Sequence, residues 1–582
     1  MLSEPHESDP SEASPLLGQP SLSSLSRKSS QTTIPDAPPD GEDTRISVSR
    51  GTTIVASLGL IMFLQGMSTS CNFSLLTTTQ SAIAADLDAF EEVTWFTSAY
   101  LVPMSSITPL AGRLSQIFSP RACVFVASLF FSLGGIVTAF SPTVEWFLFG
   151  RALTGLGGAG ILSLTIIIVL QVGGEKKRGL FLGCVNSIIT SGVSLGAVLG
   201  GAIEPNLGWR AVFWMQTPPS ILAGIVVFLS IPSHLGAGKG DNRTLKERLS
   251  QIDYAGAVLL TAAITTLLIS LSGPKVLILP LILSLVLFPT FIITEIYFAR
   301  DPIIPITLLK SRGTALTCLA TLGFMMARWS VLFYTPVYAL GVRLWAPAAA
   351  GSILIPTNLG FATGGVLAGL LHIRRAGSFY APSLITMAIF PLTLLALGLA
   401  SRAATPAALY VVLTFLNGLT TGAAVNYALV HALHLTPKHT HFVLTSLVAT
   451  FRGFAGSFGS AIGGGVFARL LANALARGFA RRGLPPRSKD ELIRRLLGSP
   501  ALVARLQGVD RAVAVEGYER ALRGLFLAAV ALAVVTVAVQ AGTGWRGYDD
   551  EGREVTGREV ESEEERRRRE REDEEVGEAA AV

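Results

Sequence analysis

The segment EWFLFGRALTGLGGAGILSLTIIIVLQ, residues 145–171, is followed after a short basic turn by GCVNSIITSGVSLGAVLGGAI, residues 183–203, and the two decide the fold. Each is long enough to cross a bilayer, which takes about 20 apolar residues. Arg151 lies inside the first segment, where a charge costs roughly 2.5–3.5 kcal/mol, so it indicates a functional interior unless the side chain snorkels to an interface. The second segment carries a stripe of small residues, typical of closely packed membrane helices: Gly192, Gly196 and Gly200.

The composition of the whole chain indicates a polytopic, all-α membrane protein. Of its 582 residues, 50% are hydrophobic and 15% are charged, whereas soluble domains carry about 25% charged residues. The mean hydropathy is +0.53. We predict about fourteen transmembrane helices, near residues 53–75, 93–114, 122–140, 145–171, 180–203, 211–231, 253–272, 275–298, 314–340, 347–371, 380–400, 407–430, 442–470 and 523–541.

The two ends of the chain are predicted to be disordered cytosolic tails. Residues 1–50 are rich in Ser, Pro and acidic residues, and residues 542–582 hold a dense mixed-charge run. Lysine and arginine are concentrated in the loops on the same side as both termini, which places those termini in the cytosol. The arginine-rich loop 471–522 falls on the opposite side, with amphipathic stretches that we expect to form surface helices.

A short segment of the N-terminal tail resembles an acidic dileucine sorting signal. The residues that match are Glu12, Leu16 and Leu17. The resemblance implies a sorting adaptor as a partner and a vacuolar membrane as the destination. The plasma membrane is the other location that the sequence leaves open.

The two deciding segments resemble the fourth and fifth helices of the major facilitator superfamily. RALTGLGGAG matches the arginine and glycine pattern of the fourth helix at Arg151 and Gly155, and the "antiporter motif" of the fifth is matched by Gly183, Gly192, Gly196, Gly200 and Gly201. The resemblance implies two six-helix bundles, at 51–232 and 313–541. A loop and two linker helices, at 233–312, point to the fourteen-helix branch of drug:proton antiporters and vacuolar basic amino-acid transporters.

Two positions depart from that family pattern. The loop after the second span matches at Gly112 and Arg121, but Gln116 stands where the family has an aspartate that helps to lock the cytosolic side. Asn72 likewise replaces an aspartate at the end of the first span, and an amide carries no titratable proton. Proton coupling at this position is therefore in doubt, and Glu295 or Asp86 would be the next carboxylates to test.

Polar residues inside the apolar spans are the candidates for substrate contact, because transporter sites lie near the bilayer midplane. The candidates are Asn72, Arg151, Asn186, Arg328, Asn358, Asn417, Asn426, Tyr427 and Arg452. Hydrogen bonds between helices explain the Asn and Tyr residues equally well. We also hypothesise that Asn72 accepts a hydrogen bond from Arg151.

These features predict a secondary transporter that moves drugs or basic amino acids by alternating access, with proton coupling expected. A siderophore or organic-anion carrier, a uniporter and a non-transporting membrane sensor stay open as alternatives. No Walker A motif is present in the sequence, so ATP-driven transport is not supported. We predict no enzymatic activity, no metal site and no cofactor other than a proton gradient. The expected partners are a small-molecule substrate and the lipid bilayer, without nucleic acid, and a monomer is expected.

Overall fold

The computed structural model describes residues 48–73, 79–89, 92–231, 253–272, 275–299, 304, 309–369, 379–437, 440–484, 486–544, 547–548 and 554–555. These residues are almost entirely helical, which confirms the all-α prediction, and their one strand pair joins β1 (Gly547–Tyr548) to β2 (Glu554–Val555). The predicted sorting signal lies outside the described residues. For some helical residues only the backbone is described, among them Asn72, Gln116, Gly183 and Asn186.

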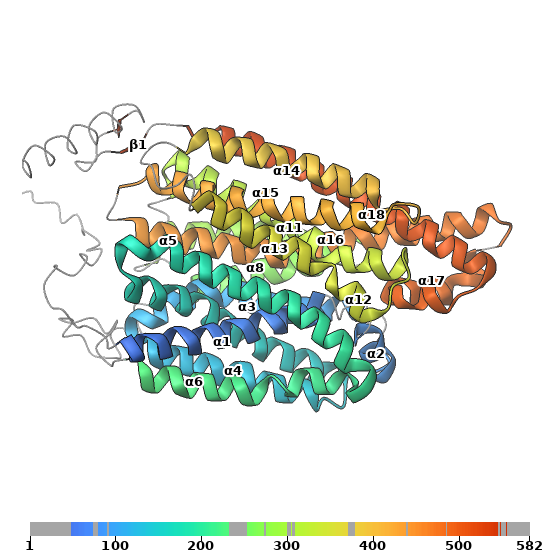
Figure 1. Ribbon diagram of the computed structural model, residues 1–582, viewed down its shortest axis with the longest axis horizontal. Helices are drawn as coiled ribbons and strands as arrows, with labels where there is room; N and C mark the ends of the chain where they lie inside the picture. Colours follow the sequence, from blue (N-terminus) through green and yellow to red (C-terminus); the bar gives the residue numbers. More distant parts are fainter. Residues whose placement is uncertain are drawn as a thin grey trace, which may run out of the picture. The chain divides into compact units, whose positions relative to one another are not determined.

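The N-terminal half consists of α1 (Val48–Phe73), α2 (Thr79–Asp86), α3 (Val93–Ile117), α4 (Pro120–Ala139), α5 (Val144–Trp214) and α6 (Thr217–Ser230). α5 and α6 together contain three apolar spans, 144–165, 187–204 and 206–230. A spanning segment is helical because lipid offers its backbone no hydrogen-bond partners. α5 packs against α1, α3 and α4 (Figure 1), so it forms the centre of this half.

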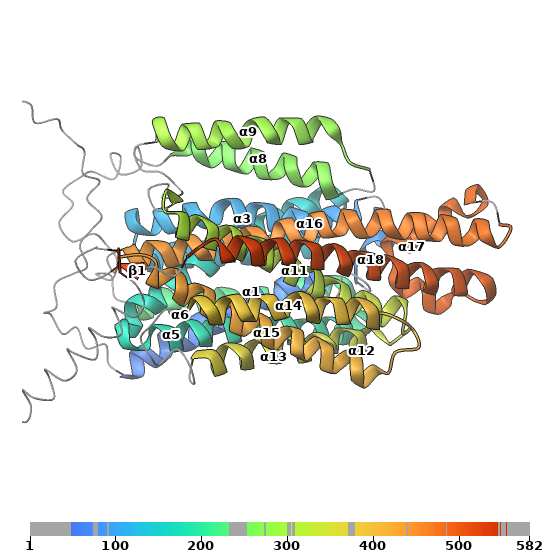
Figure 2. The ribbon, with the colours of Figure 1, turned by 90° about the horizontal axis from the view of Figure 1, so that it is seen from above.

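Two linker helices, α8 (Tyr254–Ser272) and α9 (Ile278–Tyr297), follow the N-terminal half. They pair with each other and lie along one flank of the molecule (Figure 2). α9 exposes large apolar side chains such as Leu279, at 79% of its surface, as expected for a helix that faces lipid. α8 contacts both α3 and α16, so the hairpin lies beside a junction of the two halves.

The C-terminal half consists of α11 (Arg312–Gly341), α12 (Pro347–Ser352), α13 (Leu354–Leu367), α14 (Tyr380–Ala400), α15 (Ala407–His434), α16 (His441–Arg481) and α18 (Gly508–Ala541). α11 is the most enclosed of the spans, with 72% of its apolar window buried. It packs against α15, α16 and α18. A polar side chain on α11 is therefore placed inside the half rather than toward lipid.

Twelve of the described helical segments are long and apolar enough to cross a membrane. This number confirms an integral membrane protein. α1 and α3, with 26 and 25 residues, are two further long helices of the same assembly. The number fourteen and the domain boundaries stay predictions.

The predicted loop 471–522 is a folded helical lobe, which we call the lobe. α16 continues into the lobe as far as Arg481. After it come η3 (Pro486–Lys489), α17 (Asp490–Gly498) and η4 (Pro500–Arg505), of which η3 and η4 are short 3-10 turns. α18 then begins at Gly508. Phe479, Leu496 and Tyr518 are fully buried in it, and the Tyr518 hydroxyl donates to the Leu496 carbonyl. Figure 2 shows α16 and α18 extending beyond the other helices toward α17.

The two halves meet at the α3–α16 seam and the α5–α13 seam, and α17 also touches α2. In the α3–α16 seam the hydroxyls of Ser105 and Ser457 share a hydrogen bond, and Ser457 Oγ also lies 2.9 Å from the Leu101 carbonyl oxygen. In the α5–α13 seam Ser194 Oγ lies 3.4 Å from the Leu354 carbonyl oxygen. Each seam thus contains polar contacts in an apolar surrounding.

Candidate functional site

Arg328 is the centre of the largest polar cluster among the described side chains of the C-terminal half. It comes from α11 and exposes only 3% of its surface. Its Nη1 donates to Thr357 Oγ1 and, at 3.3 Å, to Asn417 Oδ1. Its Nη2 donates to the Thr357 carbonyl at 3.2 Å and to Asn358 Oδ1 at 3.3 Å. All four acceptors are neutral, so these bonds lack the strength of a bond between two charges.

Two amides extend the Arg328 cluster to other helices. Asn417 Nδ2 donates to Thr393 Oγ1 on α14 at 2.9 Å. Asn358 Nδ2 donates to Ser194 Oγ at 2.7 Å, and Ser194 belongs to α5 in the N-terminal half. Three residues singled out from the sequence, Arg328, Asn358 and Asn417, therefore lie in one network that crosses the α5–α13 seam.

Glycines bring α13 and α15 close enough to build this cluster. A Cβ atom at Gly418 would overlap the Thr357 carbonyl, and one at Gly422 would overlap the Phe361 carbonyl. Bare glycine surfaces permit such close approach of membrane helices. The crossing at Gly418 places the preceding residue, Asn417, beside Thr357, where both accept from Arg328 Nη1.

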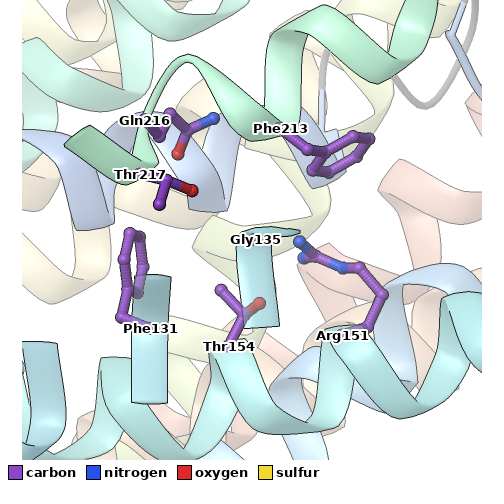
Figure 3. Close-up of a pocket in the computed structure, with 7 residues that line it drawn as sticks. All are labelled: Phe131, Gly135, Arg151, Thr154, Phe213, Gln216 and Thr217. Carbon is purple, nitrogen blue, oxygen red and sulfur yellow. The ribbon is translucent and has the colours of Figure 1, made fainter. Parts of the chain in front are cut away.

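Arg151 occupies a different site inside the N-terminal half. Its guanidinium carbon lies 4.7 Å from the ring centre of Tyr100 and 5.5 Å from that of Phe213, and 1% of its surface is exposed. A desolvated cation over aromatic rings is stabilised by about 2 kcal/mol. Beside it is a small hollow (Figure 3), lined by Phe131, Gly135, Arg151, Thr154, Phe213, Gln216 and Thr217. All of these residues come from α4, α5, α6 or the α5–α6 turn, so this hollow lies within one half.

Tyr100, the aromatic partner of Arg151, is positioned by Gln65 and Gly155. Gln65 was not singled out from the sequence, and Gly155 was assigned to a family motif. Gln65 Nε2, on α1, lies 3.3 Å from the Tyr100 hydroxyl. Gly155 lacks a side chain where a Cβ would overlap the Tyr100 carbonyl. Gln65, Tyr100 and Arg151 thus connect α1, α3 and α5. The proposed bond between Asn72 and Arg151 stays a hypothesis, because the Asn72 side chain is outside the described part.

Tyr100 offers a test of how Arg151 is held. Tyr100→Phe removes one long hydrogen bond and should lower the free energy of unfolding by about 0.5 kcal/mol. Tyr100→Leu removes the ring beneath the guanidinium as well and should cost about 3 kcal/mol. Thermal unfolding of the detergent-solubilised variants measures the difference. Equal destabilisation by the two variants would contradict a stabilising contact between cation and ring.

Asn426 and Tyr427, two other predicted substrate residues, have described partners outside the Arg328 cluster. Asn426 Nδ2 donates to the Gly422 carbonyl of its own helix at 3.1 Å. Tyr427 stacks on Phe379 with 6.3 Å between ring centres, and Arg452 lies half-buried on α16. The side chains of Asn72 and Asn186 are outside the described part. A role for these five residues in substrate contact stays a prediction.

The motif residues at the end of the second span are partly described. A Cβ at Gly112 would meet nothing within 4 Å, so this glycine is not required by packing. The Arg121 guanidinium lies 5.1 Å from the ring centre of Phe228, which joins α4 to α6. The Gln116 side chain is outside the described part. The predicted cytosolic lock therefore stays untested.

The glycine stripe of α5 packs against α1 of the same half. A Cβ at Gly192 would overlap the Phe63 carbonyl, and one at Gly196 would lie 2.6 Å from Met67 Cγ. Gly200 is buried, while the surroundings of Gly183 and Gly201 are not described. Close packing within the half explains Gly192 and Gly196, and their predicted part in rocking stays a prediction.

The two carboxylates that the sequence analysis held in reserve lie away from the Arg328 cluster. Asp86, on α2, accepts from Arg210 Nη1 at 2.6 Å and from Trp209 Nε1 at 3.3 Å, with 44% of its side chain exposed. Glu295, on α9 of the linker hairpin, accepts from the Ile304 backbone N–H at 3.3 Å. Neither residue belongs to a long helix of either half.

Long stretches of both halves contain no acidic residue. Residues 93–144, 146–174, 176–203 and 302–489 contain neither Asp nor Glu. The last of these ranges includes Arg328 and Arg452, and the second includes Arg151. Buried charges in membrane helices usually pair with one another or mark a substrate pathway. The spans that carry Arg328 and Arg452 contain no carboxylate, and the one in the span of Arg151, Glu145, is exposed in the first turn of α5.

Comparison with known proteins agrees with this architecture. Residues 58–460 match the family described as the Major Facilitator Superfamily. The MFS-type transporter clz4 of Cochliobolus lunatus is 28% identical over 83% of this chain and 84% of its own length. The Acurin A biosynthesis cluster MFS-type transporter of Aspergillus aculeatus is 26% identical over 73% and 76%. The efflux pump FUS6 of Gibberella fujikuroi is 26% identical over 56% of this chain and 59% of its own.

Solved transporter structures share the fold at low sequence identity. A bacterial homologue of the human lysosomal transporter Spinster superposes with a TM-score of 0.58, at 13% identity, over 85% of this chain and 97% of that chain. A structure of a proton-dependent oligopeptide transporter gives a TM-score of 0.55 at 14% identity, over 85% and 99%. The matched family covers most of the chain, and the helical assembly is the one these transporters share. The chain is a membrane transporter that belongs to the major facilitator superfamily.

Proposed function

We propose that this transporter exports a small organic anion by alternating access. The observation that carries the proposal is the charge of the interior: buried Arg328 and half-buried Arg452 lie on spans that contain no acidic residue. Buried Arg151 lies on a span whose one acidic residue, Glu145, is exposed in the first turn of α5. Arg328 is bonded to neutral acceptors only among the contacts described above. A desolvated guanidinium gains most from an anionic partner, and a transported anion supplies one.

This charge pattern selects among the substrates that the sequence left open. Basic amino acids and cationic drugs need acidic groups along their path, since like charges in a dry site cost several kcal/mol. An organic anion, such as a carboxylate, meets complementary charge instead. The names of related proteins, which include efflux pumps and a transporter of a biosynthesis cluster, favour export of a small organic product.

Charge movement provides a driving force for such a substrate. One elementary charge that crosses a membrane gains or loses about 2.3 kcal/mol per 100 mV. An anion carried without a counter-ion therefore responds to the membrane potential directly. The spans that carry Arg328 and Arg452 contain no carboxylate that could carry a proton beside these arginines, so we propose potential-driven anion movement over proton antiport.

We further propose a monomer in the plasma or vacuolar membrane, with both termini in the cytosol. The bias of lysine and arginine toward the loops on the side of the termini supports this orientation. The lobe then lies on the non-cytosolic side. Cysteine labelling from one side of intact vesicles at Arg494→Cys, in the exposed α17, tests the orientation.

Uptake into proteoliposomes tests the proposed substrate class. We would compare 1-naphthylacetate with its neutral counterpart, 1-naphthylacetamide, and octanoate with octanamide, using empty liposomes to correct for passive entry. A potassium gradient with valinomycin sets the potential. We expect saturable uptake of the carboxylates that increases with an inside-positive potential, and none of the amides. Equal transport of acid and amide, or transport of lysine instead, would overturn the proposal.

The two reserve carboxylates provide a further prediction. Asp86→Asn and Glu295→Gln should each leave carboxylate uptake within about twofold of the unmodified protein. The exposed Asp86–Arg210 ion pair contributes only about 0–1 kcal/mol, and Glu295 is buried on the linker helix α9, outside both halves. Uptake is measured with and without a pH gradient. Loss of a gradient-dependent component in either variant would identify a proton carrier and contradict the potential-driven scheme.

A further inference from the structure

Asn358 is the one described side chain that hydrogen-bonds to both Arg328 and the opposite half. Its Oδ1 accepts from Arg328 Nη2 at 3.3 Å, and its Nδ2 donates to Ser194 Oγ at 2.7 Å. The residue is 4% exposed, so water does not substitute for either bond. The two contacts use opposite ends of one amide group, and a change at one end therefore affects the other.

The bonds that Arg328 makes to the two asparagines are the ones that an anion would displace first. Both are 3.3 Å long and end on neutral amide oxygens. A carboxylate binds a guanidinium through two parallel, charge-assisted bonds that are about twice as strong as neutral ones. An anion that reaches the guanidinium would thus replace Asn358 or Asn417 as acceptor. Displacement of Asn358 removes the bond that holds its amide in place for Ser194.

The α5–α13 seam is narrow and apolar at this point. Val193, Leu332 and Leu354 form a small buried cluster around Ser194, and Ser194 Oγ is also bonded to the Thr190 carbonyl of its own helix at 2.9 Å. The Ser194 hydroxyl can therefore stay satisfied within α5 when Asn358 departs. Because Ser194 keeps this alternative, the contact can break without leaving an unsatisfied hydroxyl on α5.

The α3–α16 seam provides an internal comparison. Its two serines, Ser105 and Ser457, bond to each other and to the one backbone carbonyl of Leu101. Among the described contacts these bonds involve no charged side chain. The described hydrogen bonds thus connect an anion at Arg328 to the α5–α13 seam through Asn358. No such chain of described hydrogen bonds connects Arg328 to the α3–α16 seam.

We propose that Asn358 is a positioning residue that transmits the binding of an organic anion at Arg328 to the α5–α13 seam, so that an arriving anion releases the contact between the halves. The proposal rests on the proposed function, because it takes the substrate to be an anion. It assigns the anion-binding group to Arg328 and the response to Ser194. Alternating access then begins at one seam of the two.

Distance measurements between the halves test the transmission. Spin labels would be attached at Leu207→Cys and Leu409→Cys, which are 65% and 48% exposed on α5 and α15, in a background without the four native cysteines. In otherwise unmodified protein, 1-naphthylacetate should change the distance distribution and 1-naphthylacetamide should not. Asn358→Leu should still bind the carboxylate, at least as tightly as the unmodified protein because a competing acceptor is removed, and should lose the distance change.

Asn358→Asp is the second, nearly isosteric variant. It places a fixed carboxylate beside Arg328 and removes the donor to Ser194. We expect the anion-bound distance distribution without added anion and at least a tenfold loss of carboxylate affinity. Ser105→Ala, in the α3–α16 seam, is the matched control and should retain the full response to the carboxylate.

The outcomes separate this inference from the proposed function. If the unmodified protein neither binds nor transports the carboxylates, the substrate class is wrong and the transmission fails with it. If it binds and transports them while Asn358→Leu and Asn358→Asp respond as the unmodified protein does, only the transmission through Asn358 is overturned. A loss of response in Ser105→Ala alone would assign the role to the other seam.

Discussion

Replacement of Arg328 by methionine is expected to abolish carboxylate uptake, with a fall of at least about 100-fold. Methionine keeps the length and the apolar contacts of the side chain, but it removes the only charge of the cluster and leaves Thr357, Asn358 and Asn417 without their donor. Truncation of one partner in a buried, charged hydrogen-bond network costs about 2–5 kcal/mol. Arg328→Lys should retain a small part of the uptake, since a lysine supplies the charge without the bidentate geometry.

Arg523→Met is the matched control for this prediction, because Arg523 is exposed on α18 and the same change there removes an arginine outside the cluster. It should leave initial rates within about twofold. Rates are normalised to the amount of folded protein eluting as a single species from a sizing column. Full uptake by a folded Arg328→Met protein would exclude Arg328 from the substrate path.

Replacement of Gly418 by valine is expected to prevent the C-terminal half from assembling. Its side chain would occupy the position of the Thr357 carbonyl on α13, and backbone atoms cannot yield as a flexible side chain can. Overpacking typically costs about 1–3 kcal/mol and more where the backbone must shift. We expect most of the variant to be lost as aggregate, and Gly418→Ala to show a lowered midpoint of thermal unfolding.

Gly453→Ala provides the comparison, since a Cβ there would meet nothing within 4 Å. Alanine also favours a helix more than glycine does, by about 1 kcal/mol. The variant should therefore be as stable as the unmodified protein or slightly more so. Fluorescence-detected size exclusion after heating compares the two alanine variants. Equal behaviour of Gly418→Ala and Gly453→Ala would show that α13 and α15 are not in such close contact.

Much of the fold was predictable from the sequence because lipid restricts the options. Runs of about 20 apolar residues can only be helices there, and the arginine and glycine pattern around Arg151 indicated the superfamily. The fold of the lobe was harder to predict from the sequence. Its amphipathic segments suggested surface helices, but burial of Phe479, Leu496 and Tyr518 against one another depends on how α16 and α18 extend, which local pattern does not reveal.

The candidate site was predictable only in part. Arg328, Asn358 and Asn417 were noticeable as polar residues in apolar spans. Their partners Thr357 and Ser194 were not, since serine and threonine in membrane helices commonly bond to their own backbone, as Ser194 also does to Thr190. The scarcity of acidic residues was present in the sequence but becomes informative only when the structure places an arginine among neutral acceptors.

The lobe has a mechanical consequence. α16 and α18 pass into it without interruption, and the ring of Tyr518 packs against Gly341 at the end of α11, so the lobe tilts together with the C-terminal half. α17 also touches α2 of the N-terminal half. During the proposed alternating access, the lobe should therefore move with the C-terminal half, and its contact with α2 should change. An antibody fragment that binds α17 and α2 at the same time should slow transport. A fragment that binds α17 alone should leave transport unchanged and report the position of the lobe.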